Sequence, residues 1–346
     1  MNQRQNRSNW LIFLVMDREQ EELQFLGFFG ILKESIKIIF SWRKIFSQVT
    51  LALIFPLSFI FLAHIQISQL LFTNILRDQD ALNYTRVGSS RYTKLSDILS
   101  SEWSAFWLFK AAYFTFLLIL SLLSTSAVVY TIACIYTAKE ISFKKVMSVV
   151  PKVWKRLVVT FLWSFVIVMV YNVLAAVLLL SSVAFLGLSN VGVAIFVVLF
   201  ILYLSGFVYI TLVWHLASVV SVLEDVYGIK AMIKSKALIK GKMGVAAAIF
   251  LLLVLCFVGI QLLFEVGVVF APVSTEIKIV IGFLCFLLLF KVILFGLVAQ
   301  TVIYFVCKSY HHENIDKSSL ADHLEVYLGE YVPLKAKDVQ LEQFHV

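Results

Sequence analysis

Long stretches without a charged residue constrain this chain more than any other feature. Four stretches contain no Asp, Glu, Lys or Arg: residues 45–76, 111–138, 157–223 and 243–264. A helix needs about 20 apolar residues to cross the hydrocarbon core of a membrane, where a charged side chain is costly. The third stretch is long enough for two spans with a turn at SSVAFLGLSNVG (181–192), and a last span is expected at 279–307. The sequence therefore predicts an all-α, polytopic membrane protein with six transmembrane helices.

The composition excludes an ordinary soluble domain. Hydrophobic residues make up 61% of the chain and charged residues 14%, whereas soluble domains have about 45–50% apolar and about 25% charged residues. The first apolar run, LIFLVM, is short and gives way to DREQEE. This pattern does not fit a cleaved signal peptide. We predict that residues 1–28 are a cytosolic extension, in which Met16 is a candidate alternative start.

The distribution of basic residues predicts the orientation of the spans. The segment KEISFKKVMSVVPKVWKR (139–156) has six basic residues and one acid, whereas loop 77–102 has four of each. Because positively charged loops stay in the cytosol, we expect both termini in the cytosol and loop 77–102 outside. That loop contains Asn83-Tyr84-Thr85, an acceptor pattern for N-glycosylation that predicts Asn83 as the modified residue.

A short basic segment precedes each odd-numbered span. The three segments are GILKESIKIIFSWRKIF (30–46), ISFKKVMSVVPKVWKRL (141–157) and YGIKAMIKSKALIKGKM (227–243). Each is about one short helix long, so we predict three repeats of an interfacial amphipathic helix followed by a helix pair. The predicted membrane domain covers 29–307, with repeats at about 29–138, 139–225 and 226–307. A cytosolic tail is predicted at 308–346.

Apolar and basic residues separate onto opposite faces of these segments at helical spacing. The apolar stripes are Leu32, Ile36, Ile39 and Phe40 in the first segment, Phe143, Val146, Met147, Val150, Val153, Trp154 and Leu157 in the second, and Ile229, Met232 and Ile233 in the third. The basic residues predicted to face lipid headgroups are Lys33, Lys37, Arg43, Lys44, Lys144, Lys145, Lys152, Lys155, Arg156, Lys230, Lys234, Lys236, Lys240 and Lys242. Two interpretations remain open at this stage: the segments cap the bundle and enforce topology, or they recognise anionic phospholipids or a partner.

The stretch VLEDVYGIKAMIKSKALIKG (222–241) resembles a pattern in the membrane domain that precedes the catalytic domain of some bacterial glycerophosphoryl diester phosphodiesterases. The matching positions are Glu224, Gly228, Ala231, Ser235 and Gly241. This resemblance implies shared architecture rather than activity, since no phosphodiesterase domain follows the spans in this sequence. Over nearly the whole chain, including FLGFFGILKES, SWRKIF and the tail KSYHHENIDKSSLADHLEVYLGEYVPL, the sequence is similar to a family of plant six-span proteins. Its members are often labelled transmembrane protein or polyadenylate-binding protein-binding protein.

Five polar residues inside the expected spans are candidates for a functional site. Lys291 lies well inside the sixth span, where a charge is expensive and often functional. Glu265 or Asn172 is its expected partner in a buried structural pair, and the alternative is that Lys291 lines a transport or binding site. His64 and His215 stand on otherwise apolar helices, where an interhelical hydrogen bond is the favoured role.

The chain shows no catalytic or metal-binding pattern. No HExxH, paired-carboxylate, GxSxG or P-loop motif occurs in the sequence, so we expect no enzymatic activity, no cofactor and no metal site. All four cysteines fall in the expected spans or at their ends, and Cys307 at the cytosolic boundary is a candidate for palmitoylation. The tail is a candidate docking segment for a protein partner, and a nucleic-acid partner is not expected.

Three classes of function remain, in decreasing order of preference. A structural or adaptor protein that organises the membrane at an anionic cytoplasmic leaflet fits the repeated basic segments. A transporter or channel for a small solute or lipid fits Lys291 and the internal repeats. A membrane-embedded lipid enzyme is suggested by the bacterial resemblance alone. The location is expected to be the endomembrane system or the plasma membrane.

Overall fold

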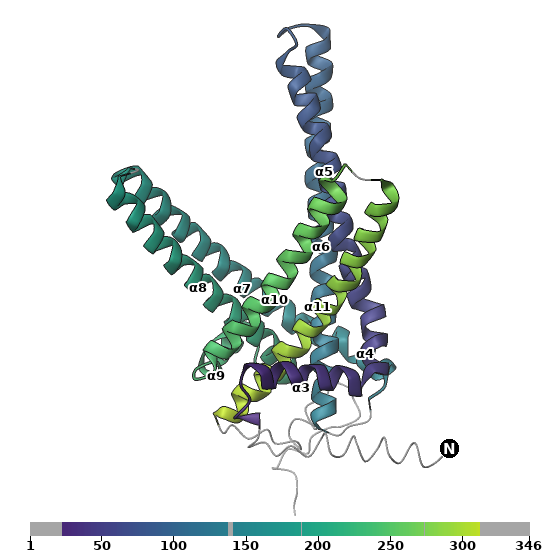
Figure 1. Cartoon of the computed structure of the whole chain (residues 1–346), viewed down its shortest axis with the longest axis vertical. Helices are drawn as coiled ribbons and strands as arrows, with labels where there is room; N and C mark the ends of the chain where they lie inside the picture. The colour runs from purple at the N-terminus through teal and green to yellow at the C-terminus, as the bar shows by residue number, and fades with distance from the viewer. Residues whose placement is uncertain (1–22, 138–140, 188, 273, 312–346) are drawn as a thin grey trace, which may run out of the picture. The chain divides into compact units, whose positions relative to one another are not determined.

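The computed structural model describes residues 23–137, 141–187, 189–272 and 274–311. These residues are almost entirely helical and include no β-strand, which confirms the predicted all-α class. The elements are α3 (Phe28–Ser41), α4 (Arg43–Val49), the π-helix η1 (Thr50–Ile54), α5 (Phe55–Asn83), α6 (Ser90–Tyr136), α7 (Phe143–Leu186), α8 (Asn190–Leu223), α9 (Ile229–Leu238), α10 (Met243–Phe264), the π-helix η2 (Glu265–Phe270) and α11 (Thr275–Tyr310) (Figure 1).

Six helical stretches in the described chain are long and apolar enough to cross a membrane, as predicted. They are Arg43–Asn83, Ser90–Tyr136, Phe143–Phe185, Asn190–Leu223, Met243–Phe270 and Thr275–Tyr310. The chain is therefore an integral membrane protein. Several of these helices are much longer than the charge-free stretches that predicted them. Helix α6 alone has 47 residues and is about 70 Å long, more than twice the thickness of a hydrocarbon core of about 30 Å.

The described chain divides into two compact units. Unit 1 contains the described residues up to Phe46, the segment Thr125–Phe250 and the segment from Leu297 onward. Unit 2 contains Ser47–Ser124 and Leu251–Gly296. Helices α6, α10 and α11 each contribute one part to each unit.

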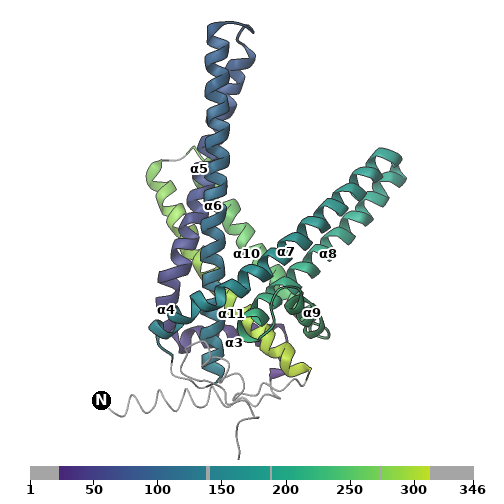
Figure 2. The ribbon, with the colours of Figure 1, turned by 180° about the vertical axis from the view of Figure 1, so that it is seen from behind.

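In unit 1, α7 and α8 run side by side as a hairpin, and α9 packs against both of them (Figures 1 and 2). The side chains buried in this unit come from the last turns of α6, the first turns of α7, the last turns of α8, α9 and the end of α11, for example Ile132, Val149, Val220, Leu238 and Val302. The outer parts of α7 and α8 instead expose aliphatic side chains along their length. Such a surface is suited to lipid rather than to water.

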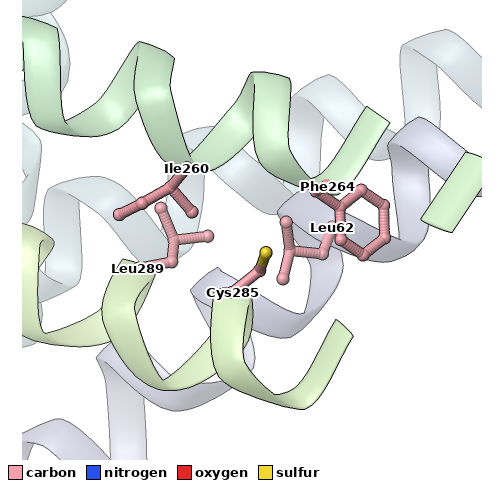
Figure 3. Packing of buried hydrophobic residues seen from close by; sticks show 5 residues of the cluster. All are labelled: Leu62, Ile260, Phe264, Cys285 and Leu289. Carbon is pink, nitrogen blue, oxygen red and sulfur yellow. The ribbon is translucent and has the colours of Figure 1, made fainter. Parts of the chain in front are cut away.

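In unit 2, α5 and α6 form a hairpin, and α10 and α11 form a second one. A buried cluster joins α5 to the second hairpin through Leu62, Ile260, Phe264, Cys285 and Leu289 (Figure 3). Phe55 packs edge-on against Phe286, with ring centroids 4.6 Å apart. These contacts hold the outer parts of α10 and α11 against α5.

The three basic segments differ in their local structure. The first contains the separate helix α3, which ends at Trp42, and the third contains the separate helix α9. The second is not a separate helix, because α7 runs without a break from Phe143 through Pro151 into the span. Helices α3 and α9 lie near the end of unit 1 at which α11 ends (Figure 1).

The apolar stripe predicted for the second segment does not face lipid. Val146, Val150, Val153 and Leu157 are at most 1% exposed, because they pack inside unit 1. On α3 the predicted stripe stays outside the protein core, because Ile36 and Phe40 are exposed, whereas the buried side chains are those of Ile31, Glu34, Ser35 and Ile38. The prediction for the second segment was wrong because an apolar stripe satisfies a protein core as well as a membrane.

Candidate functional site

A network of charged groups centred on Glu224 lies at the junction of α8, α9 and α11. The Lys234 ammonium lies 2.6 Å from one carboxylate oxygen of Glu224. Tyr304 donates a hydrogen bond of 2.6 Å to the other oxygen, and Lys308 donates one of 3.1 Å to that same oxygen. The Glu224 side chain is 13% exposed and that of Lys308 17%. One carboxylate therefore links the third basic segment, through Lys234, to the end of the last span.

The environment of Glu224 stabilises its charged form. Burial raises the pKa of this carboxyl, but the hydrogen bonds from Lys234 and Tyr304 and the positive charges of Lys308 and Lys234 lower it by more. The net result is a pKa below the usual value of about 4.5. Glu224 is therefore ionised throughout the physiological range.

The turn that follows Glu224 depends on a glycine. Gly228 has φ +63°, a conformation that side chains disfavour, and its N–H donates a hydrogen bond of 2.8 Å to Thr160 Oγ1 on α7. The Thr160 hydroxyl in turn lies 2.7 Å from Ser221 Oγ on α8. Arg156 adds an ion pair of 3.1 Å with Asp225, whose side chain is 74% exposed. The turn is thereby fixed to both helices of the hairpin.

The five positions of the resembling motif have structural roles at this junction. Ala231 and Ser235 are fully buried on α9, and Ser235 Oγ donates a hydrogen bond to the carbonyl of Val213. Gly241 has φ +86° and lies against the ring of Tyr310. The sequence pattern indicated these positions, but it gave no sign that Tyr304 and Lys308 complete the network. They are separated from Glu224 by most of two spans.

Helices α3 and α9 present exposed apolar side chains next to lysines. On α3, Phe29 is 81% exposed and Phe40 is 73% exposed, and Lys33 lies on the same exposed face. On α9, Ile233 is 64% exposed, and Lys236 is exposed beside it. Such a face can place apolar groups among acyl chains while its ammonium groups reach headgroups.

The remaining predicted headgroup residues vary in accessibility. Lys144, Lys152 and Lys155 on α7 are exposed, as are Lys230, Lys240, Arg43 and Lys44, whereas Lys37, Lys145, Arg156, Lys234 and Lys242 are half-buried. Lys234 and Arg156 already form ion pairs with Glu224 and Asp225. The main role of these two residues is therefore to stabilise unit 1 rather than to bind headgroups.

Lys291 and Glu265 are not brought together. The contacts between α10 and α11 pair Gly267 with Ile281 and Gly296 with Leu253, and this register places Lys291 about 10 Å from the level of Glu265 along the helices. Glu265 accepts a hydrogen bond of 3.0 Å from Gln261. Lys291 is exposed on α11 and forms no ion pair or hydrogen bond with another described residue. The predicted structural pair with Glu265 is absent.

Asn172 and His215 make hydrogen bonds between helices. Asn172 donates to the carbonyl of Val168 and accepts a hydrogen bond of 2.9 Å from Tyr203 on α8, so both ends of its amide are used within the α7–α8 hairpin. His215 Nδ1 lies 3.1 Å from Gln300 Oε1 on α11. These contacts match the interhelical role that the sequence favours for a lone histidine on an apolar helix.

A second polar cluster lies in unit 2, between α5 and α6. Lys110 Nζ is 2.8 Å from His64 Nε2 and 2.9 Å from Ser68 Oγ. The His64 ring stacks on Tyr113 with centroids 3.5 Å apart. Because a lysine ammonium only donates, His64 Nε2 must accept, which places the proton of the neutral ring on Nδ1. The sequence pattern around His64 did not indicate that Lys110, Ser68 and Tyr113 are its neighbours.

The two predicted modification sites have opposite accessibility. Asn83 is exposed at the last residue of α5 and stays available as an acceptor. Cys307 is fully buried in unit 1, so its thiol is not accessible for palmitoylation in this fold. Residues 312–346 of the predicted tail and residues 1–22 of the predicted N-terminal extension lie outside the described residues.

Comparison with known proteins gives one match. A family described as a domain of unknown function (DUF8558) matches residues 16–344. No curated protein and no solved structure matches the chain. Within the described residues, no group of three or more His, Cys, Asp or Glu side chains is placed to hold a metal ion. The similarity to plant six-span proteins and to the bacterial membrane domain stays a prediction.

Proposed function

This chain belongs to the DUF8558 family, and we propose that it is a structural or adaptor protein that organises the membrane at an anionic cytoplasmic leaflet. The observation that carries this proposal is the exposed apolar and lysine-bearing face of α3, repeated on α9. An anionic leaflet attracts basic residues near its surface with about 1 kcal/mol each. Anionic phospholipid headgroups are thus the partner we assign to these faces, in a role that needs no catalytic residue.

We further propose that both termini lie in the cytosol, in an endomembrane or the plasma membrane. The basic segments then face the cytosol and the turn between α5 and α6 faces outward. Each basic segment and the span pair after it form one repeat, so that the surface helices α3 and α9 recur on the same side. The continuity of α7 with its span makes the second repeat a variation of this plan.

Cysteine labelling tests the proposed orientation. Ser90 and Lys236 are both exposed in the structure, so accessibility of the side chain does not distinguish them. For protein in the plasma membrane, a membrane-impermeant maleimide added to intact cells is expected to label Ser90→Cys. It is expected to label Lys236→Cys only after permeabilisation, because that position faces the cytosol. Labelling of Lys236→Cys alone in intact cells would reverse the topology.

Lipid enrichment tests the proposed role. The full-length protein is reconstituted into nanodiscs of phosphatidylcholine with a minor fraction of phosphatidylserine, and the co-purifying lipid is quantified by mass spectrometry. Replacing Lys33, Lys37, Arg43 and Lys44 by Gln is expected to reduce phosphatidylserine enrichment severalfold, since four attractions of about 1 kcal/mol are lost. The matched control replaces Arg77, Arg86, Arg91 and Lys94, which lie on the outer hairpin. Equal enrichment in wild type and the first variant would reject the proposal.

A second candidate function is a transporter or channel. The observation that favours it is Lys291, an exposed lysine in the middle of a span without a described partner. A charge at this depth is stabilised when it lines a polar pathway. We rank this function second because the exposed faces of α3 and α9 have no role in it.

A further inference from the structure

The cluster of Lys110, His64 and Ser68 lies at a particular depth in the membrane. His64 is about 20 residues beyond Lys44 in the continuous helical stretch Arg43–Asn83, which corresponds to about 30 Å, the thickness of the hydrocarbon core. Lys44 belongs to the first basic segment, which marks one face of the membrane. The cluster therefore lies at the headgroup level of the opposite leaflet.

Aromatic side chains around the cluster support this depth. Trp103 and Trp107 on α6 flank Phe106, and the Lys110 ammonium lies 5.2 Å from the centroid of the Phe106 ring. Trp107 is 64% exposed. Tryptophan is enriched where the hydrocarbon core meets the headgroups. Trp103 and Trp107 therefore indicate the same headgroup level that the helix length from Lys44 to His64 indicates.

The charge of Lys110 is not neutralised within the described chain. Its two close neighbours, His64 Nε2 and Ser68 Oγ, are neutral acceptors, and no described carboxylate forms an ion pair with it. An ammonium has three donors, so one N–H remains. The Ser68 hydroxyl accepts from Lys110, and its own hydrogen has no described acceptor. Both side chains are partly exposed.

The cluster is also held rigidly. His64 is stacked on Tyr113 and lies parallel to Phe109, with ring centroids 3.5 Å and 5.8 Å away. A ring fixed in this way holds its Nε2 against the lysine. The ammonium and the hydroxyl are thereby positioned before any ligand binds, which reduces the entropy cost of binding.

We propose that Lys110, Ser68 and His64 form a binding site for the phosphate group of a phospholipid in the leaflet opposite the basic segments. A phosphodiester supplies one negative charge to Lys110 and acceptor oxygens to the two remaining donors. The acyl chains of the same lipid continue into the hydrocarbon core below the cluster. This site is separate from the faces of α3 and α9 and does not depend on the function proposed for them.

Binding of defined lipids to the delipidated full-length protein in detergent tests the site. Native mass spectrometry counts bound lipid after addition of phosphatidylcholine, phosphatidylglycerol or diacylglycerol with identical acyl chains. Both phospholipids are expected to bind and diacylglycerol is not, because it has no phosphate. Lys110→Met is expected to weaken phospholipid binding about tenfold or more, since it removes a charged hydrogen bond. Ser68→Ala is expected to weaken it less, and Lys110→Arg to preserve it.

The controls separate this site from other causes. Lys94→Gln removes a lysine from the same helix beyond the headgroups and is expected to leave binding unchanged. Equal binding of diacylglycerol and phospholipid, or unchanged phospholipid binding in Lys110→Met, would overturn the proposal. If Lys110→Met does not fold, Lys110→Arg and Ser68→Ala are compared with Lys94→Gln instead. Equal loss of phospholipid binding in Lys110→Arg and Ser68→Ala would then overturn the proposal. Competition by millimolar inorganic phosphate would assign the site to free phosphate rather than to a lipid.

Discussion

Glu224→Gln is expected to lower the free energy of unfolding by about 2–3 kcal/mol, because it leaves the partly buried charges of Lys234 and Lys308 without their carboxylate. Breaking a fully buried pair costs more, but Lys234 is 34% exposed and water relieves part of its charge. The change keeps the size of the side chain and an acceptor for Tyr304. Denaturation of the full-length protein in mixed micelles measures the difference.

The neighbouring residue provides a matched control. Asp225→Asn makes the same chemical change one residue later, at a side chain that is 74% exposed, and is expected to cost at most about 0.5 kcal/mol. Equal destabilisation by the two variants would mean that the Glu224 network contributes nothing special to stability.

The same variant predicts a pH dependence. The pKa of Glu224 is lowered in the folded protein, so its stabilising effect is fully present above its usual pKa of about 4.5 and is lost as the pH falls through the lower, folded value. The stability difference between wild type and Glu224→Gln is therefore expected to be constant near neutral pH and to shrink in acid. A difference that grows as the pH falls would contradict the lowered pKa.

The two faces of α11 give the second large effect. Leu289→Ala is expected to lower the free energy of unfolding by about 2–4 kcal/mol, because Leu289 is 1% exposed in the cluster of Figure 3. Lys291→Leu, two residues later on the exposed face, is expected to change it by less than about 0.5 kcal/mol. Denaturation in mixed micelles again supplies the measurement.

A double variant decides between the two interpretations of Lys291. Glu265→Leu is expected to be additive with Lys291→Leu within about 0.5 kcal/mol, because the two side chains are not in contact. Strong destabilisation by Lys291→Leu, with rescue by Glu265→Leu, would instead support the interpretation that the two residues form a structural ion pair. Additivity combined with loss of function in cells would favour the pathway interpretation.

The sequence was sufficient to predict the helical class and the number of spans. The stretches without charged residues determined the helical class and the number of spans, because the cost of a charge in hydrocarbon does not depend on tertiary contacts. The environment of Lys291 could not be predicted in the same way. Its depth follows from its position in the sixth span, but its face on α11 is decided by packing around Leu289 and Cys285.

The buried face of α3 was not predicted, because this helix is apolar on more than one side. Ile31 and Ile38 pack into unit 1, while Ile36 and Phe40 are exposed, and periodicity alone does not rank these two stripes. The Glu224 network could not be predicted from local sequence patterns for another reason. Its members Tyr304 and Lys308 lie on a helix that comes about 80 residues later. The sequence signals for Glu224 were its place in the resembling motif and its position beside a lysine-rich segment.

The length of α5 and α6 has an electrostatic consequence. From the level of His64, α5 continues to Asn83, which carries the tip of the hairpin about 28 Å further along the helix axis. With the His64 cluster at the headgroup level, as proposed above, ions screen the tip from the surface potential of the membrane, because the Debye length in physiological salt is about 8 Å. In this placement, the charges of Arg86 and Arg91 interact with soluble molecules or glycans that contact the tip. They do not respond to the lipid composition of the leaflet.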